Sequence, residues 1–189
     1  DSTQNSMIKQ CLLLLDKSRE RRKQGAFLVE GQREIQLALK GGYEIQTLLF
    51  CASLFVKEIN QYLSANTQII EISIQVYQKL AYRKTTEGVL AIVQTKQHTL
   101  SNLAFKNKSP LLLIAEAPEK PGNIGALLRS ADAANIDAFI IANPKTDLYN
   151  PNIIRSSVGC LFTNTIATGS TQEIIDFLNK RNIQLFSAI

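Results

Sequence analysis

The sequence has a single histidine and three cysteines among its 189 residues. Cys11, Cys51 and Cys160 are odd in number and far apart, and no Cys-x-x-Cys pair occurs, which argues against a disulfide framework and against a zinc site. His98 lies in a polar stretch without partner groups beside it, so we interpret it as a solvated linker residue. The sequence therefore offers almost no material for a catalytic triad or a histidine-rich metal site, and we expect no metal.

Long apolar runs and glycine-rich phosphate loops are also missing. No stretch approaches the ~20 apolar residues that a helix needs to span a bilayer, and no signal segment is visible at the start. We therefore expect a cytoplasmic protein with no membrane partner. Neither Gly-x-Gly-x-x-Gly nor Gly-x-x-x-x-Gly-Lys-[Ser/Thr] occurs, which argues against a nucleotide-dependent oxidoreductase.

The charge balance is basic, because 21 Lys and Arg residues face 16 Asp and Glu residues and give a net charge of +5 at pH 7. Such a balance favours a polyanionic partner, since neutralisation of phosphates drives non-specific binding. The densest basic cluster consists of Arg19, Arg21, Arg22 and Lys23. It is a candidate contact for a nucleic-acid backbone, and an ordinary solvated surface is an equally weighted alternative.

The first hundred residues alternate helical and β-strand patterns, which predicts a small mixed sheet flanked by helices. The sequence predicts helices at 7–17, 32–39, 54–63 and 74–80, and strands at 26–29, 45–50, 68–72 and 88–94. Between 96 and 110 the chain turns polar. We therefore expect a first domain over 1–100, a linker over 101–109 and a second domain over 110–189.

The second part alternates more cleanly. Three βα units in sequence indicate a parallel, doubly wound sheet. The sequence predicts helices at 123–134, from the pair Asn150-Pro151 onward and at 171–180, and strands at 111–115, 138–142, 163–167 and 183–189. Because the last strand has no closing helix, we expect the sequence to be a truncated portion of a longer chain.

The stretch 116–134 lies at the carboxyl end of a predicted strand and opens a helix, where α/β proteins place ligand sites. Pro121 and Gly122 shape the turn, and Asn123 is suited to cap the helix. Helical geometry places Arg129 nearly opposite the apolar stripe of this helix. From the residues alone, Arg129 is either free to meet a phosphate or an ordinary solvated arginine.

A resemblance favours the first alternative. PGNIGALLRSADA, residues 121–133, closely resembles the first signature motif of the SpoU (TrmH) family of RNA 2′-O-ribose methyltransferases, and NPNIIRSSVGCLF, residues 150–162, is similar to the segment that follows it. FLVEG at 27–31 and TEGVLAIV at 86–93 resemble the start and the end of the family's N-terminal substrate-binding domain. The resemblance spans nearly the whole chain in order.

The resemblance implies an α/β protein of two parts: a ribosomal protein L30-like α/β domain, then an α/β-knot (SPOUT) parallel-sheet domain that is incomplete here. Family members are usually homodimers whose active site forms across the interface. The implied activity is transfer of a methyl group from S-adenosylmethionine to a ribose 2′-hydroxyl of RNA, and the first domain favours ribosomal over transfer RNA. The alternative is a non-catalytic RNA-binding module, such as a ribosome-associated protein.

The resemblance also implies roles for particular residues. The family's proposed catalytic arginine matches Arg129, and its asparagine matches Asn123. A guanidinium is a poor base at neutral pH, so we expect Arg129 to stabilise the developing alkoxide and grip the adjacent phosphate while Asn123 orients Arg129 or the ribose. Arg155, Ser156 and Ser157 follow a predicted helix N-terminus, which favours RNA phosphate contact, with helix capping and packing as the alternative.

The sequence departs from the family in one respect. The family's second and third motifs, a Gly-Glu-Gly type loop and a Ser-Leu-Asn type segment, are absent from it. In the family these segments form the knot and most of the donor pocket. We therefore expect the cofactor-binding residues to lie beyond Ile189, and residues 1–189 alone to be inactive.

Overall fold

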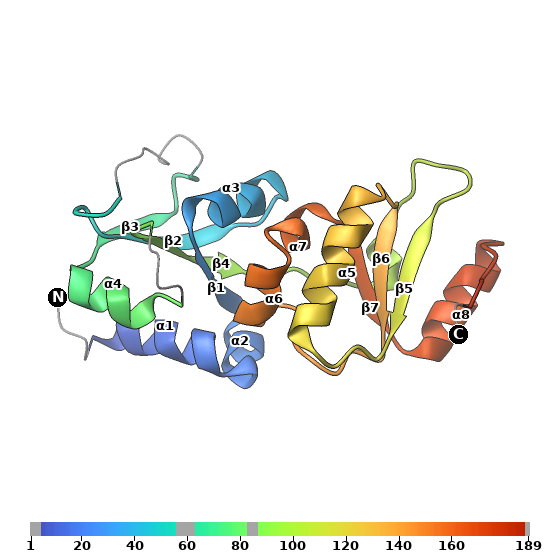
Figure 1. The fold of residues 1–189 in the computed structure, drawn as a ribbon, viewed down its shortest axis with the longest axis horizontal. Helices are drawn as coiled ribbons and strands as arrows, with labels where there is room; N and C mark the ends of the chain where they lie inside the picture. The colour runs from blue at the N-terminus through green and yellow to red at the C-terminus, as the bar shows by residue number, and fades with distance from the viewer. Residues whose placement is uncertain (1–4, 56–62, 83–86, 188–189) are drawn as a thin grey trace.

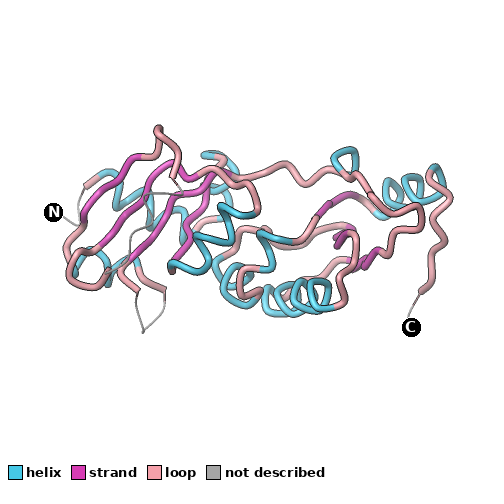
Figure 2. Tube along the Cα trace, turned by 90° about the horizontal axis from the view of Figure 1, so that it is seen from above, coloured by secondary structure: helices cyan, strands magenta, loops and turns pink. Residues whose placement is uncertain are grey.

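The computed structural model of the chain describes residues 5–55, 63–82 and 87–187 (Figure 1). Its described part contains two β-sheets, which lie one after the other along the long axis with helices between them. Figure 2 shows a long loop along one side that leads from the first sheet towards the second. None of the described helices combines the length and the apolar character that crossing a membrane requires.

The first sheet has the strand order β1-β4-β2-β3. Its central strand β4 pairs antiparallel with β1 and β2, whereas β2 and β3 are parallel. Because β1 and β4 are buried on both faces, their sequences are nearly continuous apolar runs. The strands are β1 (Ala26–Glu30), β2 (Ile45–Phe50), β3 (Gln68–Glu71) and β4 (Val89–Gln94).

Helices cover both faces of this sheet. Helices α1 (Ser6–Asp16) and α4 (Ile74–Leu80) share one apolar cluster with the sheet, and α3 (Gln32–Lys40) packs on the opposite face. The short helix α2 (Ser18–Gln24) follows α1 and contains the basic cluster. The mixed sheet with flanking helices that the alternation predicts is confirmed.

The second sheet consists of three parallel strands in the order β5-β6-β7. Helix α5 covers one face together with α6 and α7, and α8 covers the other face. The parallel sheet with helices on both faces is therefore confirmed. The elements are β5 (Leu112–Glu116), α5 (Pro121–Ala133), β6 (Ala138–Ala142), α6 (Pro151–Ser156), α7 (Cys160–Thr163), β7 (Ile166–Gly169) and α8 (Thr171–Lys180), preceded by the 3₁₀ helix η2 (Leu100–Asn102).

The two sheets share one apolar core. The ring of Phe27 on β1 stacks on the ring of Tyr149 with 4.2 Å between centroids, and Tyr43 meets Phe162 of α7 edge to face. These side chains are buried and belong to the same cluster as the inner face of α5. The division into domains with a linker at 101–109 remains a prediction, and the core is continuous across the two parts.

Two expected elements differ from the structure, and a third lies mostly outside the described residues. The strand expected at 183–189 is wrong over 183–187, where no strand forms in the described part and Leu185 and Phe186 are exposed; a strand requires a hydrogen-bonded neighbour, and residues 188–189 lie outside the described part. The strand expected at 163–167 begins at Ile166, because α7 extends to Thr163 and Asn164 is its C-cap. The helix expected at 54–63 falls mostly outside the described residues.

Candidate functional site

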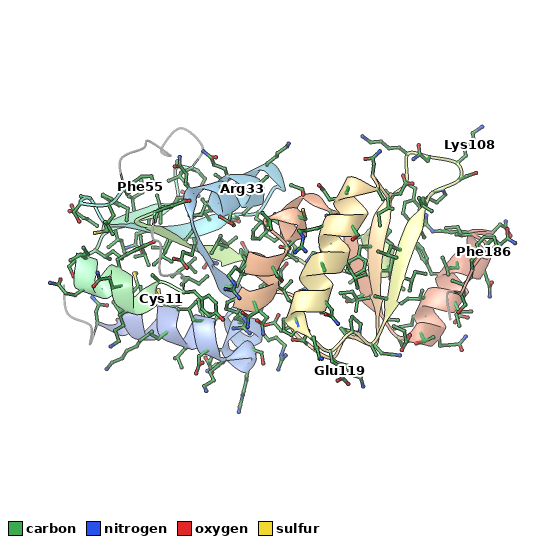
Figure 3. The ribbon with its side chains drawn as sticks, viewed as in Figure 1. Cys11, Arg33, Phe55, Lys108, Glu119 and Phe186 are labelled. Atoms are coloured by element: carbon green, nitrogen blue, oxygen red, sulfur yellow. The ribbon has the colours of Figure 1, made fainter. Side chains whose placement is uncertain are left out.

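Helix α5 begins directly after the carboxyl end of β5, with Glu119 in the turn between them (Figure 3). The helix starts at Pro121, two residues before the expected position, and Lys120 occupies the N-cap. Proline fits the first helical position because its φ angle is already helical and its missing N–H would have no partner there. The expectation that Asn123 caps the helix is therefore wrong. Its side chain is instead exposed in the first turn.

Arg129 lies on the outer side of α5. Ile124, Leu128 and Ala131 are buried against the sheet, and the 3.6-residue period places Arg129 away from them, where it is exposed as the pattern predicts. Its Nη1 donates a hydrogen bond to the carbonyl oxygen of Ser156 at the end of α6. Within the described residues Arg129 has no carboxylate partner. The guanidinium is thus anchored at one nitrogen while most of its donors point to solvent.

The contact between α5 and α6 depends on a glycine. A Cβ atom at Gly125 would lie 2.0 Å from Oγ of Ser156 and 2.8 Å from its carbonyl carbon. Only a residue without a side chain allows this approach. Gly125 therefore sets the position of the Ser156 carbonyl group that holds Arg129.

The three residues expected to contact phosphate beside a helix N-terminus lie instead at the other end of the helix. Arg155 and Ser156 form the last turn of α6, and Ser157 is its C-cap, so the argument from a helix N-terminus is wrong. Ser157 is fully buried and donates its hydroxyl to the carbonyl oxygen of Ile154 at 3.0 Å, which makes it a packing residue here. Arg155 is exposed, and Ser156 is half-buried.

The basic cluster on α2 divides into one buried and three exposed side chains. Arg21 is only 3% exposed, and its Nε donates to Oδ2 of Asp147 at 2.5 Å. Its Nη1 donates to the carbonyl oxygen of Leu14 at 2.6 Å. The expected RNA contact of Arg21 is therefore not supported, because its side chain is buried and its Nε and Nη1 donate to groups inside the protein. The members that stay accessible are Arg19, Arg22 and Lys23.

A cleft of about 690 Å³ lies between the two parts of the chain. Most of its lining comes from α2, the residues after β4 and the loop between β6 and α6, and Asp16 of α1 and Thr168 of β7 complete it. The loop between β6 and α6 follows the carboxyl end of β6, where parallel sheets place ligand sites. The two carboxylates of the cleft, Asp16 and Asp147, are each paired with a neighbouring cation, whereas Arg22 and Lys145 have no such partner within the described residues. The cleft therefore favours an anion.

His98 lines this cleft and is not the solvated linker residue that the sequence suggests. It is partly buried, its Nε2 lies 2.8 Å from the hydroxyl of Tyr149, and its Nδ1 lies 3.3 Å from the carbonyl oxygen of Ile166. Burial lowers the pKa of His98, the Ile166 carbonyl opposes this change, and the charge of Lys96 adds to it. His98 is therefore neutral at pH 7 and joins the connecting loop to the shared core.

The tips of the parallel strands carry one ordered carboxylate. Glu116 at the end of β5 accepts hydrogen bonds from Nδ2 of Asn143 and from Oγ1 of Thr171, both at 2.8 Å. These two bonds lower the pKa of Glu116, and Lys145 contributes to the same direction. Glu116 is thus an ionised, weakly basic group that orders three strand ends, and it is poorly suited to remove a proton.

Neither a metal nor a methyl donor can be assigned to this chain's described residues. No group of three His, Cys, Asp or Glu side chains is placed to hold a metal ion within them. The 690 Å³ cleft and a 260 Å³ groove beside β3 contain neither Arg129 nor Asn123. Both cavities therefore lie apart from the two residues that the family motif singles out.

Comparisons with known proteins agree with this arrangement. Residues 5–91 match the MRM3-like substrate binding domain, and residues 110–189 match the SpoU rRNA Methylase family. The chain is 29% identical over 186 residues to the 23S rRNA (uridine(2479)-2′-O)-methyltransferase of Streptomyces viridochromogenes, covering 95% of this chain. It spans 64% of the length of that protein.

Two solved structures have the same fold. A crystal structure of an RNA 2′-O ribose methyltransferase is 36% identical with a TM-score of 0.78, covering 96% of this chain and 69% of the other. The SpoU methyltransferase AviRb from Streptomyces viridochromogenes, solved in complex with the cofactor AdoMet, is 28% identical with a TM-score of 0.80, covering 95% of this chain and 69% of the other.

Proposed function

Since the chain belongs to the SpoU family of RNA 2′-O-ribose methyltransferases, we propose that the protein methylates a ribose 2′-hydroxyl of ribosomal RNA. The observation that carries this proposal is Arg129. It occupies its place in the family's first motif, projects away from the core, and is anchored by the Ser156 carbonyl group. The named 23S rRNA activity of the Streptomyces relative supports ribosomal RNA as the substrate class.

S-adenosylmethionine supplies the electrophilic methyl group in this reaction. The part of Arg129 is electrostatic, because a guanidinium with a pKa above ~12 cannot accept a proton at neutral pH. Its free N–H donors are suited to the developing negative charge on the ribose oxygen and to the neighbouring phosphate. The Ser156 anchor restricts the side chain before RNA arrives, so less conformational freedom is lost on binding.

Asn123 has a positioning role in the proposal. It is exposed in the first turn of α5, where backbone N–H groups carry partial positive charge. Its amide is both a donor and an acceptor, so it can bind a ribose hydroxyl whether that hydroxyl donates or accepts the hydrogen bond. Asn123 and Arg129 would then contact the same nucleotide from one helix.

The RNA backbone would be held by exposed cations on both parts of the chain. Arg19, Arg22 and Lys23 extend from α2, and Arg22 also lines the 690 Å³ cleft. Arg155 precedes the half-buried Ser156, whose carbonyl oxygen holds Arg129. Each phosphate contact of this kind adds salt-dependent affinity. We also propose that the protein is a homodimer and that it is cytoplasmic, as the sequence suggests. The mass of the protein in solution tests the homodimer.

The experiment is methyl transfer from labelled S-adenosylmethionine to ribosomal RNA by the full-length protein. Arg129→Ala should lower the rate by about 10²- to 10³-fold, the usual effect of removing one donor to a developing oxyanion, while RNA affinity changes little. The matched control is Lys180→Ala at the exposed end of α8, which should keep full activity. An active Arg129→Ala protein would refute the role of Arg129. RNA binding without any transfer by the unsubstituted protein would favour the RNA-binding module.

A further inference from the structure

Tyr82 is an exposed aromatic residue that is nevertheless held at both ends. Its side chain lies on the segment after α4 and is 48% exposed. Its backbone N–H donates to Oε2 of Glu30 at 2.9 Å, and its hydroxyl donates to Oδ1 of Asn152 on α6 at 2.7 Å. The ring is therefore fixed in place, although nearly half of its surface faces water.

A guanidinium lies over this ring. Cζ of Arg155 is 5.3 Å from the centroid of the Tyr82 ring, within the range of a cation–π contact. Asn152 and Arg155 are three residues apart on α6, so they lie on the same side of that helix. Tyr82 also lines a small cavity of about 30 Å³ together with Leu28 and Ile154. Tyr82 thus bridges the first sheet and α6.

The exposure of the Tyr82 ring does not by itself indicate a binding site, because isolated apolar side chains are common on protein surfaces. A structural bridge would explain the hydroxyl bond to Asn152, but it gives no reason for a rigid aromatic surface to remain open to water. The same helix also connects this surface with the candidate catalytic group. Arg155 precedes Ser156, whose carbonyl oxygen holds Arg129.

We propose that the Tyr82 ring and the Arg155 guanidinium form a stacking platform for an unpaired base of the substrate RNA, adjacent to the nucleotide that Arg129 holds. This inference rests on the proposed function. Proteins that read unpaired RNA stack its bases on aromatic rings and on the planes of arginine guanidinium groups. A ring that is already immobilised loses little conformational freedom when a base covers it. The platform therefore discriminates unpaired RNA from duplex RNA, whose bases already stack on each other.

The test compares two RNA probes, an unpaired RNA of about 12 nucleotides and the duplex formed from it, a length within the usual footprint of single-strand binding sites. Tyr82→Leu should weaken binding of the unpaired RNA by about 5- to 150-fold, the range for loss of one base–aromatic stack, and leave duplex binding unchanged. Tyr82→Phe keeps the ring and loses only the hydroxyl bond, so it should bind unpaired RNA nearly as the unsubstituted protein does. Arg155→Lys should lose affinity for unpaired RNA while the salt dependence of binding stays the same, because its charge is kept.

The outcomes separate the platform from a simple bridge and from the proposed function. Equal losses in Tyr82→Phe and Tyr82→Leu, or a loss shared by both RNA probes, would mean that the hydroxyl bridge matters and the ring surface does not. Undiminished binding of unpaired RNA by Tyr82→Leu, with an unchanged thermal unfolding midpoint, would also overturn the platform. If the unsubstituted protein binds neither RNA probe at low salt, both the proposed function and the platform fail.

Discussion

The Arg21 guanidinium and the Asp147 carboxylate form a buried salt bridge, with Nε 2.5 Å from Oδ2, between residues 126 positions apart. The side chains are 3% and 10% exposed. Arg21 also donates to the carbonyl oxygens of Leu14 and Leu15, so its remaining charge-bearing nitrogens are partly satisfied. The pair fixes α2 of the first part against the loop that leads from β6 to α6.

Removing one partner of this salt bridge should strongly destabilise the protein. Asp147→Asn leaves the Arg21 charge buried without its counter-ion, and such losses cost about 3 to 5 kcal/mol of the free energy of unfolding. Urea unfolding measures the change. The matched control is Asp16→Asn, which breaks the exposed pair with Lys17 and should cost less than about 1 kcal/mol. A cost for Asp147→Asn as small as that of the control would mean that water enters the site.

Two glycines three residues apart in α5 should respond oppositely to alanine. Gly125→Ala inserts a methyl group within 2.0 Å of Oγ of Ser156, so α5 and α6 must separate, at a cost of about 1 to 3 kcal/mol. Gly122→Ala meets nothing within 4 Å in the first helical turn and should be neutral or slightly stabilising. Thermal unfolding of both variants checks this contrast.

The same pair of variants tests the anchor of Arg129. If the position of the Ser156 carbonyl group matters for Arg129, Gly125→Ala should lower methyl transfer more than RNA binding, whereas Gly122→Ala should leave the rate near its original value. Full activity in a Gly125→Ala protein would show that the anchor has no part in catalysis.

His98 should make the stability of the protein depend on pH below neutrality. Because burial lowers the pKa of His98 from 6.5, the unfolded chain takes up a proton first as the pH falls. The free energy of unfolding should therefore decrease below about pH 6.5, by at most about 1.4 kcal/mol per pH unit, and this effect should vanish above that value. The sequence has no other histidine, so urea unfolding of His98→Gln between pH 7.5 and about pH 5.5 should give a flatter profile. Equal slopes in both proteins would contradict a buried neutral imidazole.

The fold was largely predictable because its main signals are local. The near-continuous apolar runs of β5 and β6 can each be recognised within a few residues. The segment 183–187 was not, because an apolar run forms a strand only when another strand pairs with it. The start of β7 was also predicted too early, because the short helix α7 precedes it. The four residues of α7 are too few to show a helical period in the sequence.

The candidate site was predictable where one helix determines it. The period of α5 alone separates the buried Ile124 and Leu128 from the exposed Arg129. The burial of Arg21 and the contacts of His98 could not be foreseen, because Asp147 and Tyr149 lie far away in the sequence and no local pattern joins them. Tyr82 was missed for the same reason. The fixed position of its ring depends on a hydrogen bond to Asn152, which lies 70 residues further along the sequence.

The stacked rings of Phe27 and Tyr149 have a consequence for how the polypeptide can be divided. A protease that cuts the exposed loop at 106–109 breaks the covalent connection but leaves the aromatic contacts intact. The two pieces should then remain bound to each other through a gel-filtration column. Halves produced separately should each be poorly folded and should recover their structure on mixing, because neither half can shield those rings from water without the other.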